Sequence, residues 1–174
     1  MHCGMFRAME SPSTEGSRAA VVACRWQWSR LDGLAPSDLY AVLAARQLVF
    51  AVEQHCAFQD ADGLDLSAWH LLGWVDGDDG PSLAAYLRII DPAAKYAEPS
   101  IGRVLTVPPW RGIGLGRVVM IEGIARAEAV WPGRPVRIAA QHRLERFYES
   151  LDFRTVSAPY IEDGIPHVEM LRSG

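Results

Sequence analysis

The chain has 174 residues, of which 49% are hydrophobic and 22% charged, as in an ordinary globular protein with one core. Its formal net charge of -4 at neutral pH disfavours electrostatic binding of nucleic acid. No apolar run approaches the roughly 20 residues that span a bilayer and no signal peptide is recognisable, so we expect a cytoplasmic protein with no membrane partner.

The N-terminal part is expected to hold a leader, a strand, a helix and a long loop. Residues 1–20 are rich in Ser, Gly, Glu and Met without periodicity, which predicts a disordered leader, whereas a single domain is expected over residues 21–174. The apolar run Val21–Trp28 predicts a strand. The range Pro36–Phe50 begins with the helix-start signal Pro-Ser-Asp and predicts an amphipathic helix. The acidic stretch 53–68 predicts a long loop.

The central part is expected to form a hairpin, a further strand and a long helix. Trp69–Val75 and Leu83–Ile90 predict two strands, and the cluster Asp-Gly-Asp-Asp-Gly-Pro between them predicts the hairpin turn. Ile101–Val107 predicts the next strand, and Gly114–Val130 predicts a helix. The apolar positions expected along one side of that helix are Leu115, Val118, Ile121, Ala125 and Ala129.

The C-terminal part completes the pattern. Val136–Gln141 predicts a strand, Leu144–Leu151 a short helix, and Phe153–Ser157 and His167–Leu171 the last two strands. The order β-α-β-β-β-α-β-α-β-β contains more strands than helices and several hairpins. The expected fold class is therefore α/β in the mixed, α+β sense, with a mixed, mostly antiparallel central sheet and helices on both faces, rather than a Rossmann sheet.

The strongest chemical signal is the run Arg111-Gly112-Ile113-Gly114-Leu115-Gly116 between an expected strand and an expected helix. Glycines let backbone N–H groups approach a ligand without a Cβ in the way, and a helix N-terminus attracts anions, so this turn suits a diphosphate. A tight turn without a ligand is the structural alternative. A dinucleotide site is disfavoured because G-x-G-x-x-G fails, and ATP hydrolysis is disfavoured because the Lys-Ser/Thr of a Walker A motif is missing.

Two motifs resemble the GNAT superfamily of acyltransferases. Arg-x-x-Gly-x-Gly at residues 111–116 resembles its coenzyme A pyrophosphate loop, and the segment 147–153, Phe-Tyr-Glu-Ser-Leu-Asp-Phe, resembles its FYExLGF segment. Asp152 stands where the family usually has glycine, at a position that commonly needs the left-handed conformation, which Asp tolerates better than most residues. Further segments are similar to the ElaA-like branch within roughly residues 25–172, namely Arg46 to Gln54, Ile101 to Val104, Ala139 to Gln141 and Glu162 to His167.

The resemblance implies an enzyme that binds acetyl-CoA and moves its acetyl group onto an amine. In that fold the strand before the loop carries a bulge and splays from the next strand, and acetyl-CoA lies in the opening. Val104, Leu105 and Thr106 would line the pantetheine, where a backbone N–H would polarise the thioester carbonyl. Gln141 would lie beside the pantetheine as well. The pyrophosphate would be held by Arg111, Gly112, Ile113, Gly114, Leu115, Gly116 and Arg117.

The resemblance also implies acid–base chemistry. Tyr148 matches the tyrosine that the family commonly uses as general acid on the coenzyme A sulfur. The alternative is a purely structural role, in which Tyr148 is a core aromatic on an amphipathic helix. Both histidines considered for proton transfer lie near a strand start, where half-buried structural histidines are common. A water chain could replace a side-chain base. The side chains considered for the general base are Glu53, His70, Glu162, Asp163 and His167.

Two arginines are expected in apolar surroundings. Arg46 shares a helix face with Val42 and Phe50, so its side chain either extends to the surface or pairs with a carboxylate and helps to wall the acceptor pocket. The same alternatives apply to Arg103 on the presumed central strand.

The acceptor is expected to be a small-molecule or peptide amine, and a homodimer is compatible with the resemblance. Glu53, Glu162 and Asp163 as a set would favour a cationic acceptor, although each one alone is better explained as a solvated loop charge. The cysteines, at positions 3, 24 and 56, are irregularly spaced without a CxxC pair, so no metal is expected. A non-catalytic acyl-CoA binding or sensing module is the competing function, since a binder needs the glycine loop but not Tyr148.

Overall fold

The computed structural model describes residues 23–55, 58–78 and 80–174 of the chain. The expected leader and the first two residues of the expected first strand lie outside the described residues. No helix of the described residues is long and apolar enough to cross a membrane.

The described residues form one mixed sheet of eight strands, in the order β1-β2-β3-β4-β5-β8-β6 with β7 paired to β8. Neighbouring strands are antiparallel except β4 and β5, which run parallel. This confirms the predicted mixed, mostly antiparallel sheet. The strands are β1 Arg25–Arg30, β2 Trp69–Gly77, β3 Gly80–Ile90, β4 Ser100–Thr106, β5 Val136–Gln141, β6 Arg154–Thr155, β7 Tyr160–Glu162 and β8 Ile165–Arg172.

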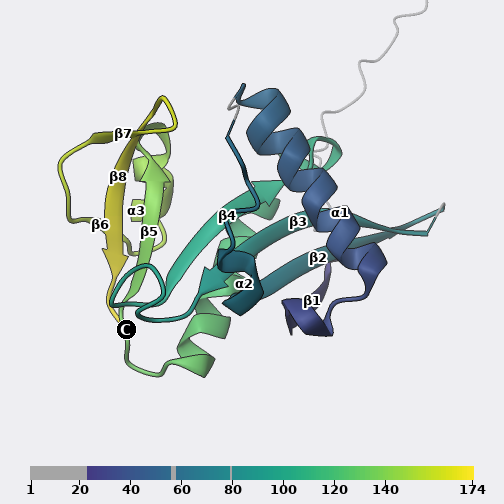
Figure 1. The fold of residues 1–174 in the computed structure, drawn as a ribbon, viewed down its shortest axis with the longest axis horizontal. Coiled ribbons are helices and arrows are strands. Elements are labelled where there is room, and N and C mark those ends of the chain that lie inside the picture. The colour runs from purple at the N-terminus through teal and green to yellow at the C-terminus, as the bar shows by residue number, and fades with distance from the viewer. Residues whose placement is uncertain (1–22, 56–57, 79) are drawn as a thin grey trace, which may run out of the picture.

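Helices cover both faces of the sheet. Figure 1 shows helix α1 across one face of β2–β4 and helix α2 on the opposite face. Side chains that alternate along β3 divide accordingly, since Leu87 joins the core cluster beneath α2 and Tyr86 joins the cluster beneath α1. The helices are α1 Pro36–Arg46, its π-helical continuation η2 Gln47–Glu53, α2 Leu115–Val130 and α3 Glu145–Glu149, and the 3-10 turns are η1 Leu31–Gly33, η3 Leu64–Ser67, η4 Pro108–Trp110 and η5 His142–Leu144.

The prediction misses one strand. The expected loop before the last strand contains β7, whose three residues pair with the start of β8 across a turn at Asp163 and Gly164. A run this short carries no readable two-residue period, so only the pairing in the fold reveals it.

The predicted apolar side of the long helix α2 is wrong. The side that packs on the sheet includes Gly123, where an added Cβ would come within 2.5 Å of Leu87 Cδ2. The closest approach of α2 to β3 needs a residue without a side chain. A prediction based on bulky apolar residues therefore selects another side of the helix. Of the predicted positions, Leu115 is buried and the other four are exposed, namely Val118, Ile121, Ala125 and Ala129. The buried residues of α2 are Leu115, Val119, Met120, Gly123, Ile124 and Ala127.

Strands β4 and β5 separate soon after they meet. They pair only at Ser100 with Arg137 and at Ile101 with Ile138, although both strands continue beyond these positions. The splay that the resemblance implies is therefore present.

Strand β4 also carries the implied bulge. Tyr86 of β3 pairs with Leu105, whereas Arg88 pairs with Gly102, so β4 holds one extra residue over this interval. Within it, Arg103 has a φ of +52°, in the left-handed region that residues with a Cβ seldom adopt. The bulge therefore lies at the start of the segment Val104–Thr106, which is expected to line the pantetheine.

Candidate active site

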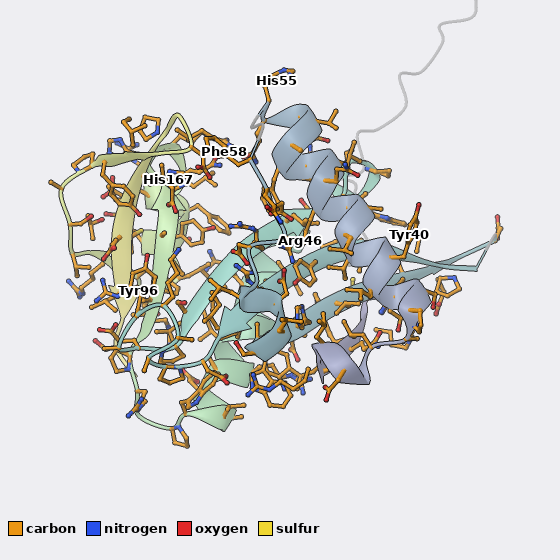
Figure 2. All side chains as sticks on the ribbon, viewed as in Figure 1. Tyr40, Arg46, His55, Phe58, Tyr96 and His167 are labelled. Atoms are coloured by element: carbon orange, nitrogen blue, oxygen red, sulfur yellow. The ribbon has the colours of Figure 1, made fainter. Side chains whose placement is uncertain are left out.

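A cleft of about 720 Å³ opens where β4 and β5 separate. Its walls come from η2 and the segment after it, from β4, β5 and α3, and from the turn between β7 and β8. Figure 2 shows Phe58, which lines the cleft, between helix α1 and the side of the molecule that carries His167. The predicted site residues that line the cleft are Glu53, Val104, Leu105, Thr106, Arg111, Gln141, Tyr148, Glu162, Asp163 and His167.

His70 does not reach the cleft. It is fully buried in β2, and both ring nitrogens are engaged, with Nε2–H donating to the Asp65 carbonyl at 3.0 Å and Nδ1 accepting from the Tyr86 hydroxyl at 2.7 Å. Burial lowers the pKa of His70, which keeps the ring neutral. The structure therefore makes His70 a core residue and separates it from the other candidate bases.

The glycine run forms the turn into α2. Gly112 and Gly114 have φ values of +78° and +84°, and Gly114 caps the helix without a side-chain hydrogen bond. The first N–H groups of any helix lack intrahelical partners and carry partial positive charge, so this turn can bind an anion. The residues after Arg111, from Gly112 to Arg117, lie beside the cleft rather than among its lining residues.

Two arginines tie the turn to its surroundings. Arg111 donates to the Thr106 carbonyl at 2.9 Å and to Glu53 Oε2 at 2.8 Å, so it joins the end of β4 to the end of η2. Arg117 donates to the hydroxyl of Ser150 at 2.7 Å and to its carbonyl at 3.0 Å, which links the start of α2 to the end of α3.

Gln141 connects two walls of the cleft. Its Nε2 donates to Gln54 Oε1 at 3.1 Å, and its Oε1 accepts from Arg143 Nε at 3.0 Å. The side chain thus links β5 to the segment after η2, and both contribute to the cleft wall.

Tyr148 belongs both to the core and to the cleft wall. Its ring meets those of Phe147 and Phe153 edge-on, and only 8% of the residue is exposed, yet it lines the cleft. Burial raises the pKa of Tyr148 to about 12 against a smaller lowering effect of Arg143, so its hydroxyl is protonated at neutral pH. Asp152, just after this helix, has a φ of +67°, which confirms the left-handed conformation expected there.

The remaining candidate bases differ in their engagement. His167 is half-buried in β8, and its Nδ1–H donates to the Ile165 carbonyl at 2.8 Å, which leaves Nε2 as the basic nitrogen. Glu53 is held in the ion pair with Arg111. Glu162 lies 4.0 Å from Lys95 Nζ, and Asp163 occupies the exposed turn between β7 and β8.

Arg46 is part of a closed ring of alternating charges, which we call the Arg–Asp ring. Asp60 pairs with Arg46 and Arg103, Asp62 pairs with Arg103 and Arg88, and Asp65 pairs with Arg88 and Arg46. The ion pairs of the fully buried Arg46 confirm the expected pairing with carboxylates, and a side chain extended to the surface is wrong. Arg46 is not among the residues that line the cleft, so the expectation that its side chain walls the acceptor pocket is wrong. The members of the ring are Arg46, Arg88, Arg103, Asp60, Asp62 and Asp65.

Arg88 and the pairing of the three aspartates were not expected from the sequence. The sequence does carry a sign of this pairing. Arg88 interrupts an apolar strand, where a charge needs a partner, and the acidic stretch 53–68 offers several carboxylates. In the structure these carboxylates face guanidinium groups. Within the described part of the chain, no group of three or more His, Cys, Asp or Glu is arranged to hold a metal ion.

Comparison with known proteins identifies the family. A family model described as an acetyltransferase (GNAT) domain matches residues 79–173. The chain belongs to the GNAT family. Protein ElaA of Escherichia coli is 40% identical over 149 residues, which cover 84% of this chain and 95% of ElaA. A UPF0039 protein of Synechocystis is 40% identical over 146 residues, which cover 84% of this chain and 93% of that protein.

Solved structures agree with this GNAT assignment. The crystal structure of E. coli ElaA matches with a TM-score of 0.78 and 39% identity, covering 86% of this chain and 99% of that one. An acyl-CoA N-acyltransferase from Pseudomonas aeruginosa matches with a TM-score of 0.80 and 39% identity, again covering 86% and 99%. The GNAT fold and the similarity to the ElaA-like branch are therefore confirmed, and family and fold are those of an acyltransferase.

The Arg–Asp ring predicts that this GNAT domain loses stability in acid. Burial alone would raise the pKa of Asp62, but hydrogen bonds from Arg88 outweigh it and lower the pKa from 3.8 to about 2. A carboxyl whose pKa is depressed by folding stabilises the protein above its ordinary pKa and loses that contribution as the pH falls through the folded value. The free energy of unfolding, measured in urea, should therefore decrease as the pH falls from about 4 to about 2.

Asp62→Asn should make this pH dependence shallower and lower stability at neutral pH. Asp32→Asn, at an exposed position in η1, is the control and should leave the dependence as in the wild type. Equal slopes for the wild type and Asp62→Asn would show that the ring carboxylate is not linked to folding.

Proposed function

We propose that this GNAT protein transfers an acetyl group from acetyl-CoA to the amine of an acceptor. The observation that carries the proposal is the separation of β4 and β5 after Ile101 and Ile138, which opens the cleft next to the glycine turn of α2. A bulged strand, an anion-attracting helix start and a protonated buried tyrosine meet there. Release of coenzyme A from acetyl-CoA in the presence of an amine tests the proposal.

The residues at the cleft fit the diphosphate and the pantetheine arm of acetyl-CoA. An added Cβ at Gly112 or Gly114 would meet no protein atom within 4 Å, so the space beside the turn is open to a ligand. Arg111, the residue before Gly112, lines the cleft and can donate to an anion, while Glu53 balances its charge in the unliganded protein. We infer that the run from Gly112 to Arg117 binds the diphosphate and that Val104–Thr106 and Gln141 line the pantetheine.

When bound, acetyl-CoA supplies an activated thioester. The amine nitrogen bonds to the thioester carbon, the C–S bond breaks, the sulfur leaves with a proton, and the nitrogen loses one. We assign the role of proton donor to Tyr148, which is protonated at neutral pH. A backbone N–H within Val104–Thr106 polarises the carbonyl oxygen.

We infer that His167 is the general base. The Ile165 carbonyl fixes its tautomer, so that Nε2 carries the lone pair, and the ring lines the cleft. Glu53 is turned to Arg111 by an ion pair, and His70 is sealed in the core, so neither offers a comparable acceptor for the amine proton. Glu162 and Asp163 flank the same end of the cleft and keep the role of attracting a cationic amine, as a small molecule or a peptide.

His167→Gln is expected to lower kcat by about 10²-fold at neutral pH, because the amine must then lose its proton to water. Its rate should climb about tenfold per pH unit until the amine's own pKa, since only the free amine reacts. Steady-state rates across pH, with acetyl-CoA saturating, measure both effects. His142→Gln, in η5 and outside the cleft lining, is the matched control and should behave as the wild type. A His167→Gln variant with the wild-type rate and pH profile would remove His167 from the mechanism.

A further inference from the structure

The Arg–Asp ring reaches from the core to the cleft. Arg46 and Arg88 are 0% and 2% exposed, whereas the Arg103 side chain is 32% exposed and lines the cleft with Asp60. In Figure 2, Arg46 lies near the centre of the molecule. The ring thus joins α1, β3, the bulge of β4 and the segment 60–65 into one electrically balanced unit.

Each member of the ring has two partners of opposite charge. Arg46 Nε lies 2.6 Å from Asp60 Oδ2, and Arg103 Nε lies 2.6 Å from Asp60 Oδ1, so one carboxylate ties the buried arginine to the exposed one. Arg46 also donates to the Asp60 carbonyl at 2.8 Å. The position of Asp60 is therefore set from the core, and Asp60 in turn sets the position of the Arg103 guanidinium.

Arg103 is the member with an unfavourable backbone. Its φ of +52° places its backbone in the left-handed conformation, which costs free energy for residues that carry a Cβ. The ion pairs with Asp60 and Asp62 compensate that cost and hold the bulge in this shape. A bulge bends its strand and re-aims the backbone groups in it and after it, and these are Val104 within the bulge and Leu105 and Thr106 after it.

We propose that the ring is a positioning device, in which Asp60 and Arg103 hold the bulge of β4 so that the N–H groups of Val104–Thr106 face the thioester. This rests on the proposed function, because the thioester is the group that these N–H groups polarise. Arg103 and Asp60 act through the backbone and are positioning residues rather than catalytic ones.

Two substitutions at Arg103 separate this role from simple stabilisation. Arg103→Ala and Arg103→Gly remove the same ion pairs, and both leave Asp60 paired with Arg46 and Asp62 paired with Arg88. They differ in backbone preference, since glycine adopts a positive φ without cost and alanine does not. A purely structural ion pair, or a direct contact of Arg103 with the acceptor, predicts equal losses in both variants.

The expected result is a kcat for Arg103→Ala that is roughly a hundredfold below the wild type, the lower end of the loss when one carbonyl-polarising donor is removed. Arg103→Gly should retain at least roughly a third of the wild-type kcat, because the bulge keeps its shape. The rate to measure is acetyl-CoA hydrolysis without an acceptor, alongside the melting temperature of each variant. Equal kcat values for the two variants at equal melting temperature would overturn the proposal.

A backbone readout keeps this test apart from the proposed function. The amide resonances of Leu105 and Thr106 in two-dimensional NMR spectra should move in Arg103→Ala and stay near their wild-type positions in Arg103→Gly. If the wild type cleaves no acetyl-CoA but this pattern appears, the acetyl transfer is wrong and the control of the bulge by the ring stands. If both variants shift these resonances alike, the ring does not hold the bulge.

Discussion

The Tyr148→Phe variant is expected to lose about 10²–10⁴-fold in kcat while its affinity for acetyl-CoA stays nearly unchanged. The substitution keeps the ring that packs against Phe147 and Phe153 at the cleft wall and removes only the hydroxyl. Without that proton the sulfur must leave as a thiolate or take its proton from water. Steady-state kinetics gives kcat, and calorimetric titration gives the affinity.

The raised pKa of Tyr148 adds a second expectation. Because burial raises it to about 12, the acid stays protonated through neutral and moderately alkaline pH, and kcat should show no alkaline loss from this group below that range. Tyr40→Phe, on the exposed side of α1, is the control and should leave kcat as in the wild type. Wild-type turnover in Tyr148→Phe would return Tyr148 to the role of a core aromatic.

The second large effect concerns the diphosphate turn. Gly114→Val is expected to abolish the binding of acetyl-CoA, because a β-branched side chain at a φ of +84° strains the turn and fills the space that the ligand needs. In the wild type, acetyl-CoA should raise the melting temperature by mass action, and this shift should vanish in the variant. Thermal unfolding with and without acetyl-CoA, together with calorimetry, measures it.

Gly133→Val is the matched control for that variant. Gly133 has a φ of +69° and, like Gly114, open space where a Cβ would stand, but it lies in the turn between α2 and β5, at the other end of α2 from Gly114. Backbone strain alone should therefore lower the melting temperature of both variants and leave the acetyl-CoA shift of Gly133→Val intact. A Gly114→Val variant that keeps the shift would show that the turn does not hold the diphosphate.

Elements with strong local patterns could be predicted from the sequence. Strand β5 has the predicted bounds Val136–Gln141, and the hairpin of β2 and β3 follows from the Asp- and Gly-rich turn between two apolar runs. The glycine turn also lies where its motif places it, at the start of α2. In each case the signal is contained in residues that are neighbours in the chain.

The parts that could not be predicted depend on approach in space. The side of α2 that packs on the sheet is set by the contact of Gly123 with Leu87, and no pattern within the helix sequence indicates this contact. Arg111 and Glu53 meet although 58 residues separate them, so the sequence offered Glu53 as a base when the fold engages it in an ion pair. The Arg–Asp ring likewise joins residues from α1, β3 and β4.

Tyr148 shows how a pattern can support two roles at once. As an aromatic on an amphipathic helix it predicts a core residue, and as part of the segment 147–153 it predicts a general acid. The structure places its ring in the core and at the cleft wall together. Burial raises the pKa of the hydroxyl to about 12, so the proton stays on Tyr148 at neutral pH.

The most direct measurement is the release of coenzyme A from acetyl-CoA by the wild-type protein, followed with and without a panel of primary amines. The panel should contain cationic, neutral and anionic amines at matched concentration. We expect release that depends on an amine, exceeds the amine-free rate and falls in Tyr148→Phe. Tight binding of acetyl-CoA with no amine-dependent release for any member of the panel would contradict acetyl transfer and favour an acyl-CoA binding module.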